Sequence, residues 1–222
     1  SKENNDNTNK EEGIQYIKIS ATEGYFKAQY YYSIMLKKGE DIPKNVDESN
    51  SYLKKAANNG LVEAMHDYGL LNLNNKEESL LYLKKASDKG DIDSIYHYGE
   101  VLLQNSEFPK VQEEASKYIK IAAWNDHSES MRKYGQMLLN GQVVHFNKNK
   151  GLKFYKKSID KGNTEAMFDY ANMLKKGDGV EINLEEAEKY YKMAADQGNS
   201  KAMFEYSQML SQGSLATNDT RE

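Results

Sequence analysis

Apolar residues recur at spacings of three and four along most of the chain, which is the pattern of helices with one buried face. The stretch 163–198 shows this most clearly, because two such segments flank the loop 177–180, which reads Gly-Asp-Gly-Val. Gly198 closes the stretch, and glycine is the usual residue of a left-handed helix C-cap. The stretch is therefore predicted to be a hairpin of two helices.

This hairpin pattern repeats along the chain with a nearly constant period. Five full units run 25–60, 61–90, 91–126, 127–162 and 163–198, and only the second is short, by six residues. Residues 11–24 align with the second half of a unit, and 199–213 with the first half. The full-length units span 36 residues each. A period of this length predicts stacked hairpins, because one hairpin cannot bury its apolar face alone. We therefore expect an all-α solenoid of antiparallel helix pairs, with about twelve helices.

The two ends of the chain lack this pattern. Residues 1–10 are polar and rich in asparagine, so we expect a disordered tail there. The solenoid then covers 11–213, and residues 214–222 are expected to fray. The half repeat at each end also favours the interpretation that the sequence is a piece of a longer chain.

Each unit has a first helix, here named helix A, and a second, named helix B. Helix A carries a tyrosine at one position in every copy, always followed by a small residue. These pairs are Tyr32–Ser33, Tyr68–Gly69, Tyr98–Gly99, Tyr134–Gly135, Tyr170–Ala171 and Tyr206–Ser207. Because glycine within a helix costs about 1 kcal/mol relative to alanine, its repeated use predicts that another helix passes close by.

Helix B is expected to begin at an asparagine that is followed three residues later by a glutamate, a capping-box-like signal. The pairs are Asn9–Glu12, Asn45–Glu48, Asn75–Glu78 and Asn183–Glu186. Helix B also carries lysines in its last turns, where the helix dipole favours cations.

The segments AMFDYANMLKKGDGV (166–180) and EAEKYYKMAADQG (186–198) resemble the Sel1-like repeat (SLR) family, a relative of the tetratricopeptide repeat, and SMRKYGQMLLNGQVV (130–144) is similar. The resemblance covers 11–213. It implies a right-handed superhelix of antiparallel helix pairs that acts as an adaptor, with the A helices lining the concave side. The sequence departs from the family pattern at Gly151 and at Asp126, which replaces a closing glycine.

Composition narrows the classes of partner and chemistry. A net charge of −4 argues against a nucleic-acid partner, and no apolar run approaches the roughly 20 residues of a membrane span. The absence of cysteine excludes a thiolate metal site, and the four histidines include no close i, i+4 pair. The sequence contains no hydrolase, kinase or nucleotide-binding signature. We therefore expect no catalytic residue, metal or cofactor, and a cytoplasmic protein.

A second set of helix A positions varies from copy to copy and is not needed for the core. In the four central copies it holds seven carboxylates and two lysines, which predicts an acidic groove for a basic or amphipathic peptide. The alternative is a solvated helix face. The candidate binding residues, here named the helix A stripe, are Tyr31, Glu63, Asp67, Asp93, His97, Glu100, Glu129, Lys133, Gln136, Glu165, Asp169, Asn172 and Glu205.

The lone tryptophan, Trp124, occupies a helix B position that is polar in the other copies. It is either an exposed contact anchor for a partner or a cover over the junction left by Asp126. Together these patterns predict a non-catalytic scaffold that binds a partner protein or peptide. The alternative is an accessory region that recruits substrate within a longer kinase- or ubiquitin-ligase-associated protein.

Overall fold

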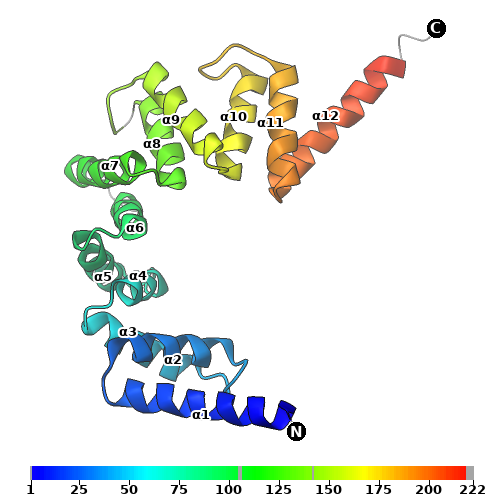
Figure 1. The fold of residues 1–222 in the computed structure, drawn as a ribbon. Coiled ribbons are helices and arrows are strands. Elements are labelled where there is room, and N and C mark those ends of the chain that lie inside the picture. The colour runs from blue at the N-terminus through cyan, green and yellow to red at the C-terminus, as the bar shows by residue number, and fades with distance from the viewer. Residues whose placement is uncertain (1, 105–106, 142, 219–222) are drawn as a thin grey trace. The chain divides into compact units, whose positions relative to one another are not determined.

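The computed structural model describes residues 2–104, 107–141 and 143–218, with side chains from residue 9 to residue 211. These residues form twelve α-helices and no strand (Figure 1). The helices are α1 (Lys2–Thr22), α2 (Phe26–Lys38), α3 (Val46–Asn58), α4 (Val62–Leu71), α5 (Lys76–Asp88), α6 (Ile92–Leu103), α7 (Pro109–Trp124), α8 (Ser128–Asn140), α9 (Lys148–Asp160), α10 (Thr164–Lys176), α11 (Leu184–Asp196) and α12 (Ser200–Asn218). The predicted all-α solenoid is confirmed.

The helices pack as hairpins in sequence order: α2 on α3, α4 on α5, α8 on α9 and α10 on α11. Each helix B ends at a tight turn before the next helix A, and Gly60, Gly90, Gly162 and Gly198 have φ values between +81° and +97° in these turns. Asp126 takes the same left-handed conformation with φ +63°. The turns therefore have one geometry whether or not glycine is present.

The loops between helix A and helix B are held by a backbone hydrogen bond that recurs. The amide of the asparagine before helix B donates to a leucine carbonyl in helix A: Asn45 to Leu36 at 2.9 Å, Asn147 to Leu138 at 2.8 Å, and Asn183 to Leu174 at 2.9 Å. The same asparagines cap helix B with their side chains, and Asn45 Oδ1 accepts from the Glu48 amide at 3.1 Å. Three predicted caps are thus present, at Asn45, Asn75 and Asn183.

The helix A tyrosines form the core of each hairpin by meeting an aromatic ring of helix B edge to face. The ring centroids of Tyr68 and Tyr82 lie 4.7 Å apart, and those of Tyr134 and Phe154 lie 5.1 Å apart. Tyr68 and Tyr134 are almost completely buried. The glycine after the tyrosine allows helix B to pack closely against helix A. A Cβ built on Gly135 would lie only 3.0 Å from the Gly151 carbonyl oxygen. The predicted close helix approach is therefore present.

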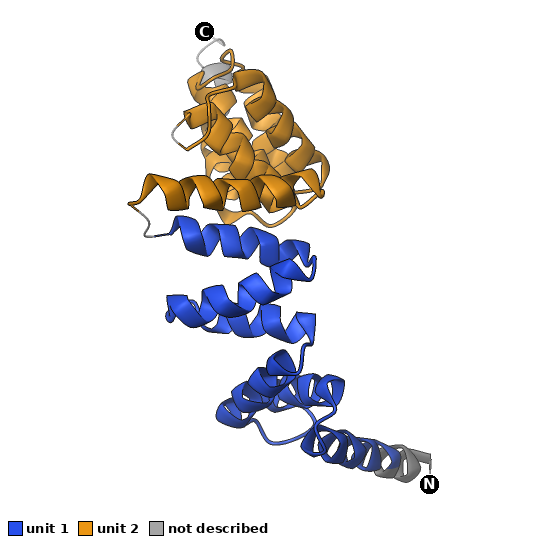
Figure 2. Ribbon diagram, turned by 90° about the vertical axis from the view of Figure 1, so that its left-hand side faces the viewer, with its two compact units in different colours: residues 1–105 blue, residues 106–222 orange. Residues whose placement is uncertain are grey.

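The chain divides into two compact units, residues 1–105 and 106–222 (Figure 2). The division falls between α6 and α7, within the predicted repeat 91–126. That repeat therefore contributes its helix A to unit 1, where α6 packs on α5, and its helix B to unit 2, where α7 packs on α8. Its loop lacks the Gly-x-Gly-Val sequence seen at 177–180.

The helices at the two ends are longer than the sequence pattern indicates. Residues 2–10, for which the sequence predicts a disordered tail, are the first turns of α1, so Asn9 lies within that helix and caps nothing. No proline interrupts this segment, and its polar side chains do not prevent backbone hydrogen bonds. The last helix, α12, continues past residue 213 to Asn218. Residues 219–222 of the expected frayed tail lie outside the described residues.

Candidate functional site

A groove in unit 2 opens between the successive A helices α8 and α10, and we name it the α8–α10 groove. It has a volume of about 760 Å³. Gln136 and Asn140 line it from α8, and Asp169, Asn172 and Lys176 line it from α10. All five occupy the variable helix A positions singled out in the sequence, and Gln136, Asp169 and Asn172 belong to the helix A stripe. The structure thus brings together stripe residues from two repeats.

The floor and rim of this groove are apolar and aromatic, which the sequence pattern does not indicate. Leu139 of α8, Tyr155 of α9, and Phe168 and Met173 of α10 line it, together with Phe146 of the α8–α9 loop. Phe146 is 65% exposed. Polar stripe residues and a partly exposed apolar surface therefore share one groove.

Unit 1 has a smaller groove at the same repeat position, between α2 and α4, with a volume of about 330 Å³. Ile34, Asp67 and Leu70 line it at the positions that Gln136, Asp169 and Asn172 occupy in unit 2. The groove is therefore a product of how adjacent repeats pack, and its lining varies from repeat to repeat.

Stripe carboxylates form bonds between adjacent A helices. The Tyr30 hydroxyl donates to Asp67 Oδ2 at 2.7 Å, and Arg132 Nη1 donates to Asp169 Oδ2 at 2.8 Å. Both pairs join residues 37 apart in the sequence, so they link the same two repeat positions. Between the second and third repeats the matching residues are His66 and His97, whose rings are tilted at 57° to each other with centroids 5.5 Å apart. The first residue of each pair is large in every copy, a signal that the sequence offers and that the stripe pattern misses.

Arg132 lies at the centre of the most extensive of these networks. Its Nε donates to Glu129 Oε1 at 3.0 Å while Nη1 holds Asp169, and Asn163 Nδ2 donates to Glu129 Oε2 at 2.8 Å. Desolvation opposes ionisation of Glu129, but the hydrogen bonds from Arg132 and Asn163 outweigh it and leave its pKa below the ordinary value. Burial raises the pKa of Asp169, and the bond from Arg132 offsets this only in part.

Other stripe carboxylates also have intramolecular partners. Glu165 Oε1 accepts from Asn199 at 3.1 Å, and Glu205 Oε2 pairs with Lys175 at 2.9 Å. The structure thus alters the expected charge of the helix A face, because Arg132 and Lys175 lie outside the stripe and neutralise members of it. Of the remaining stripe residues, four are exposed and four are partly buried. The exposed ones are Tyr31, Glu63, Asp93 and Gln136, and the partly buried ones are His97, Glu100, Lys133 and Asn172.

Trp124 at the end of α7 is exposed and also packs against a neighbouring helix. Its side chain is 60% exposed, yet its ring meets Phe154 of α9 edge to face at a centroid distance of 5.7 Å. Lys150 Nζ lies 5.6 Å from the indole centroid. The tryptophan therefore covers the packing of α7 on α9 and leaves one face open to solvent.

The described residues lack two further features, a metal-binding cluster and a membrane-spanning helix. No group of three histidine, cysteine or carboxylate side chains there is placed to hold a metal ion. None of the helices in that part of the chain is both long and apolar enough to cross a membrane.

The described helices and their inter-repeat grooves define a class of protein, an α-solenoid of antiparallel hairpins. The Sel1 repeat family model matches residues 26–61, 62–91, 128–163 and 164–199, together more than half of the chain. The chain belongs to the Sel1 repeat family. These matches are four of the predicted units displaced by one residue, and the unit without a match, 91–126, is the one divided between the two compact units.

Solved structures share this fold. A protective antigen present in uropathogenic Escherichia coli strains has 24% identity and a TM-score of 0.75, and the match covers 90% of this chain but only 44% of that one. A Sel1 repeat protein from Oxalobacter formigenes has 24% identity and a TM-score of 0.73, over 82% of this chain and 75% of that one. An immunity protein from Pseudomonas aeruginosa has 22% identity and a TM-score of 0.57, over 81% and 67%. Among curated proteins no sequence matches significantly.

Proposed function

We propose that this chain is a non-catalytic scaffold that binds an amphipathic peptide segment of a partner protein in the α8–α10 groove. The observation that carries the proposal is the lining of the groove, in which variable polar residues from two repeats surround a partly exposed apolar floor. Proteins of the Sel1 repeat family typically serve as interaction scaffolds. A groove between packed helices is preformed, so little conformational entropy is lost when a peptide binds.

The charge of the groove favours an amphipathic occupant over a purely basic one. The lining carries two carboxylates, Asp169 and Asp178, and two lysines, Lys148 and Lys176. Asp169 is already paired with Arg132. An acidic attraction for a basic peptide is therefore small. The apolar side chains of Phe146, Phe168 and Met173 supply the surface that the apolar side of the peptide contacts.

The test combines selection of peptides with a variant that fills the groove. Peptides that bind the full chain are selected from a display library, and their affinities are measured by fluorescence anisotropy. Gln136 is exposed and lines the groove, so Gln136→Trp should block it without disturbing the core. The matched control is Gln208→Trp, at the same repeat position in α12, which is also exposed. We expect Gln136→Trp to weaken binding by about tenfold or more, since it removes surface near the centre of the site.

Two results would contradict the proposal. One is a selection that yields no peptide for the wild-type chain, and the other is an equal loss of affinity in the two tryptophan variants. The alternative function, recruitment of a substrate for a longer protein, would use the same groove. This alternative is supported by the Escherichia coli antigen, of which the match covers only 44%, so that a related protein is much longer than this chain. The alternative predicts that the selected peptides match segments of an enzyme's substrates.

A further inference from the structure

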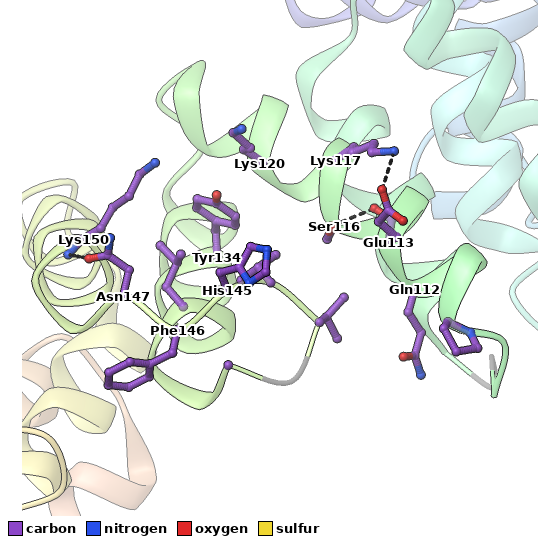
Figure 3. A pocket seen from close by; sticks show the side chains of 15 residues that line it. Gln112, Glu113, Ser116, Lys117, Lys120, Tyr134, His145, Phe146, Asn147 and Lys150 are labelled. Atoms are coloured by element: carbon purple, nitrogen blue, oxygen red, sulfur yellow. Dashed lines mark hydrogen bonds and ion pairs between the residues drawn. The ribbon is translucent and has the colours of Figure 1, made fainter.

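A second groove in unit 2 lies among α7, α8 and the start of α9, and we name it the α7–α9 groove. Its volume is about 800 Å³. Lys117 and Lys120 line it from α7, Tyr134 from α8 and Lys150 from α9, and the α8–α9 loop adds Val143, Val144 and His145 (Figure 3). In that view the Tyr134 ring lies between the side chains of Lys120 and Lys150. The groove thus combines cationic side chains with an apolar wall.

In unit 1 the residues at the corresponding repeat positions interact with one another. Lys54 of α3 lies with Nζ 5.4 Å from the Tyr68 ring centroid and pairs with Glu78 Oε1 at 2.8 Å. The Tyr68 hydroxyl donates to the same carboxylate oxygen at 3.0 Å. Lysine, tyrosine and glutamate from three successive helices therefore form a closed set in which the lysine has its counter-ion within the chain.

In the α7–α9 groove the counter-ion of this set is replaced by a second cation. Lys120 and Tyr134 occupy the positions of Lys54 and Tyr68, and Lys150 stands where unit 1 has Glu78. The side chain of Lys120 is exposed and has no carboxylate partner among the described residues. Two like charges at one groove repel each other, and this repulsion is relieved when an anion binds between them.

The other charges of the groove do not supply that anion. Glu113 is the one carboxylate among the described lining residues, and it pairs with Lys117 at 2.9 Å on its own helix. Lys150 Nζ instead lies 5.6 Å from the Trp124 ring, and this cation–π contact leaves the net charge of the amine unchanged. The groove therefore has an excess of positive charge beside an exposed tryptophan, on a chain whose net charge is −4.

We propose that the α7–α9 groove is a second binding site, which takes an acidic peptide segment of a partner protein through its carboxylates. Aspartate or glutamate side chains of the segment pair with Lys120 and Lys150, in the place that Glu78 fills in unit 1. Apolar side chains of the segment contact Val143 and Val144, which are partly buried in the groove wall. This site differs in charge from the α8–α10 groove, so the two grooves select different segments.

The test measures the affinity of the full chain for a fluorescein-labelled decaglutamate peptide, with decalysine as the opposite-charge control. The informative variant is Lys150→Glu, which restores the glutamate of unit 1 and gives Lys120 a partner within the chain. It also completes the capping box with Asn147, whose Oδ1 already accepts from the Lys150 amide at 3.0 Å, so the melting temperature should stay equal or rise. The control for net charge is Lys189→Glu on α11, which is exposed and outside the groove.

We expect decaglutamate to bind the wild-type chain with an affinity that falls as salt is added, and to change the fluorescence of Trp124 on binding. Lys150→Glu should weaken this binding by about tenfold or more, while Lys189→Glu should leave it nearly unchanged. Equal losses in the two variants would show a bulk charge effect and overturn the proposal. It would be overturned equally by absence of decaglutamate binding, or by inorganic phosphate binding in place of the peptide.

Discussion

The close approach of α8 and α9 at Gly135 makes a quantitative prediction about stability. A Cβ built on Gly135 would lie 2.9 Å from Tyr155 Cδ2, 3.0 Å from the Gly151 carbonyl oxygen and 3.4 Å from Phe154 Cβ. Tyr155 is only 3% exposed and cannot turn aside. The substitution Gly135→Ala therefore requires the two helices to separate by about 0.5 Å if normal van der Waals contact is to be restored.

Two effects of opposite sign determine the size of the change. Alanine has a higher helix propensity than glycine, which stabilises α8 by about 1 kcal/mol. Overpacking at a buried contact costs about 1–3 kcal/mol, and here one of the opposing atoms is backbone and cannot change rotamer. The balance is a loss of about 0–2 kcal/mol, and because the opposing backbone atom cannot move aside we expect its upper half. Gly135→Ala should therefore lower the free energy of unfolding by about 1–2 kcal/mol.

Urea denaturation followed by far-UV circular dichroism measures this difference. With a denaturant slope of about 2 kcal/mol per molar, the transition midpoint should fall by about 0.5–1 M. Gly13→Ala is the matched control, because Gly13 is within α1 and a Cβ there would meet no atom within 4 Å. That variant should gain up to about 1 kcal/mol from helix propensity alone. The reasoning is refuted if Gly135→Ala is as stable as the wild type while Gly13→Ala is stabilised.

Three further predictions concern polar contacts and a strained turn. Hydrogen bonds hold the pKa of Glu129 below its ordinary value, so the ionised form stabilises the folded chain. This stability is fully present above the unfolded-state pKa of about 4.3, and it is lost as the pH falls through the lower folded-state pKa. Glu129→Gln should therefore cost about 1–2 kcal/mol near pH 7 and progressively less as the pH falls below about 4 in paired urea titrations; a cost independent of pH would contradict this. Tyr30→Phe should cost about 1 kcal/mol, since it removes the 2.7 Å bond to Asp67, whereas Tyr31→Phe at the exposed neighbouring position should change the melting temperature little. Asp126→Gly should raise the free energy of unfolding by up to about 1 kcal/mol, because the residue has φ +63° and its exposed pair with Lys161 contributes little; a lower melting temperature would show that the pair outweighs the strain.

Short-range features of the fold could be predicted from the sequence because they depend on neighbouring residues. The caps at Asn45 and Asn183 use a side chain and an amide three residues apart. The tight turns need one residue of positive φ at a fixed distance from the helix end, as at Gly60 and Gly162. Such contacts repeat with the sequence, so the period predicts them wherever the signal residues occur.

Local signals fail where another contact or the lack of a stop signal decides the structure. Composition predicts a disordered tail at residues 1–10, but nothing in that segment ends a helix, and α1 begins at Lys2. In the repeat 91–126, α6 packs on α5 within unit 1 and α7 packs on α8 within unit 2. The first outcome follows from the lack of a helix-breaking residue, and the second involves packing partners that the repeat pattern does not specify.

For the sites, the sequence by itself determined which helix A positions vary and that they share one face, because a helix repeats every 3.6 residues. The sequence could not determine how much of their charge is neutralised or bonded by residues of neighbouring repeats. Asp67 is bonded by Tyr30 and Asp169 by Arg132, each 37 residues earlier, and these pairs exist only because neighbouring A helices lie side by side. The same holds for Lys150, an ordinary surface lysine in the sequence. Only the packing of α7, α8 and α9 places it in a groove with Lys120, where its charge has no carboxylate of the described chain to oppose it.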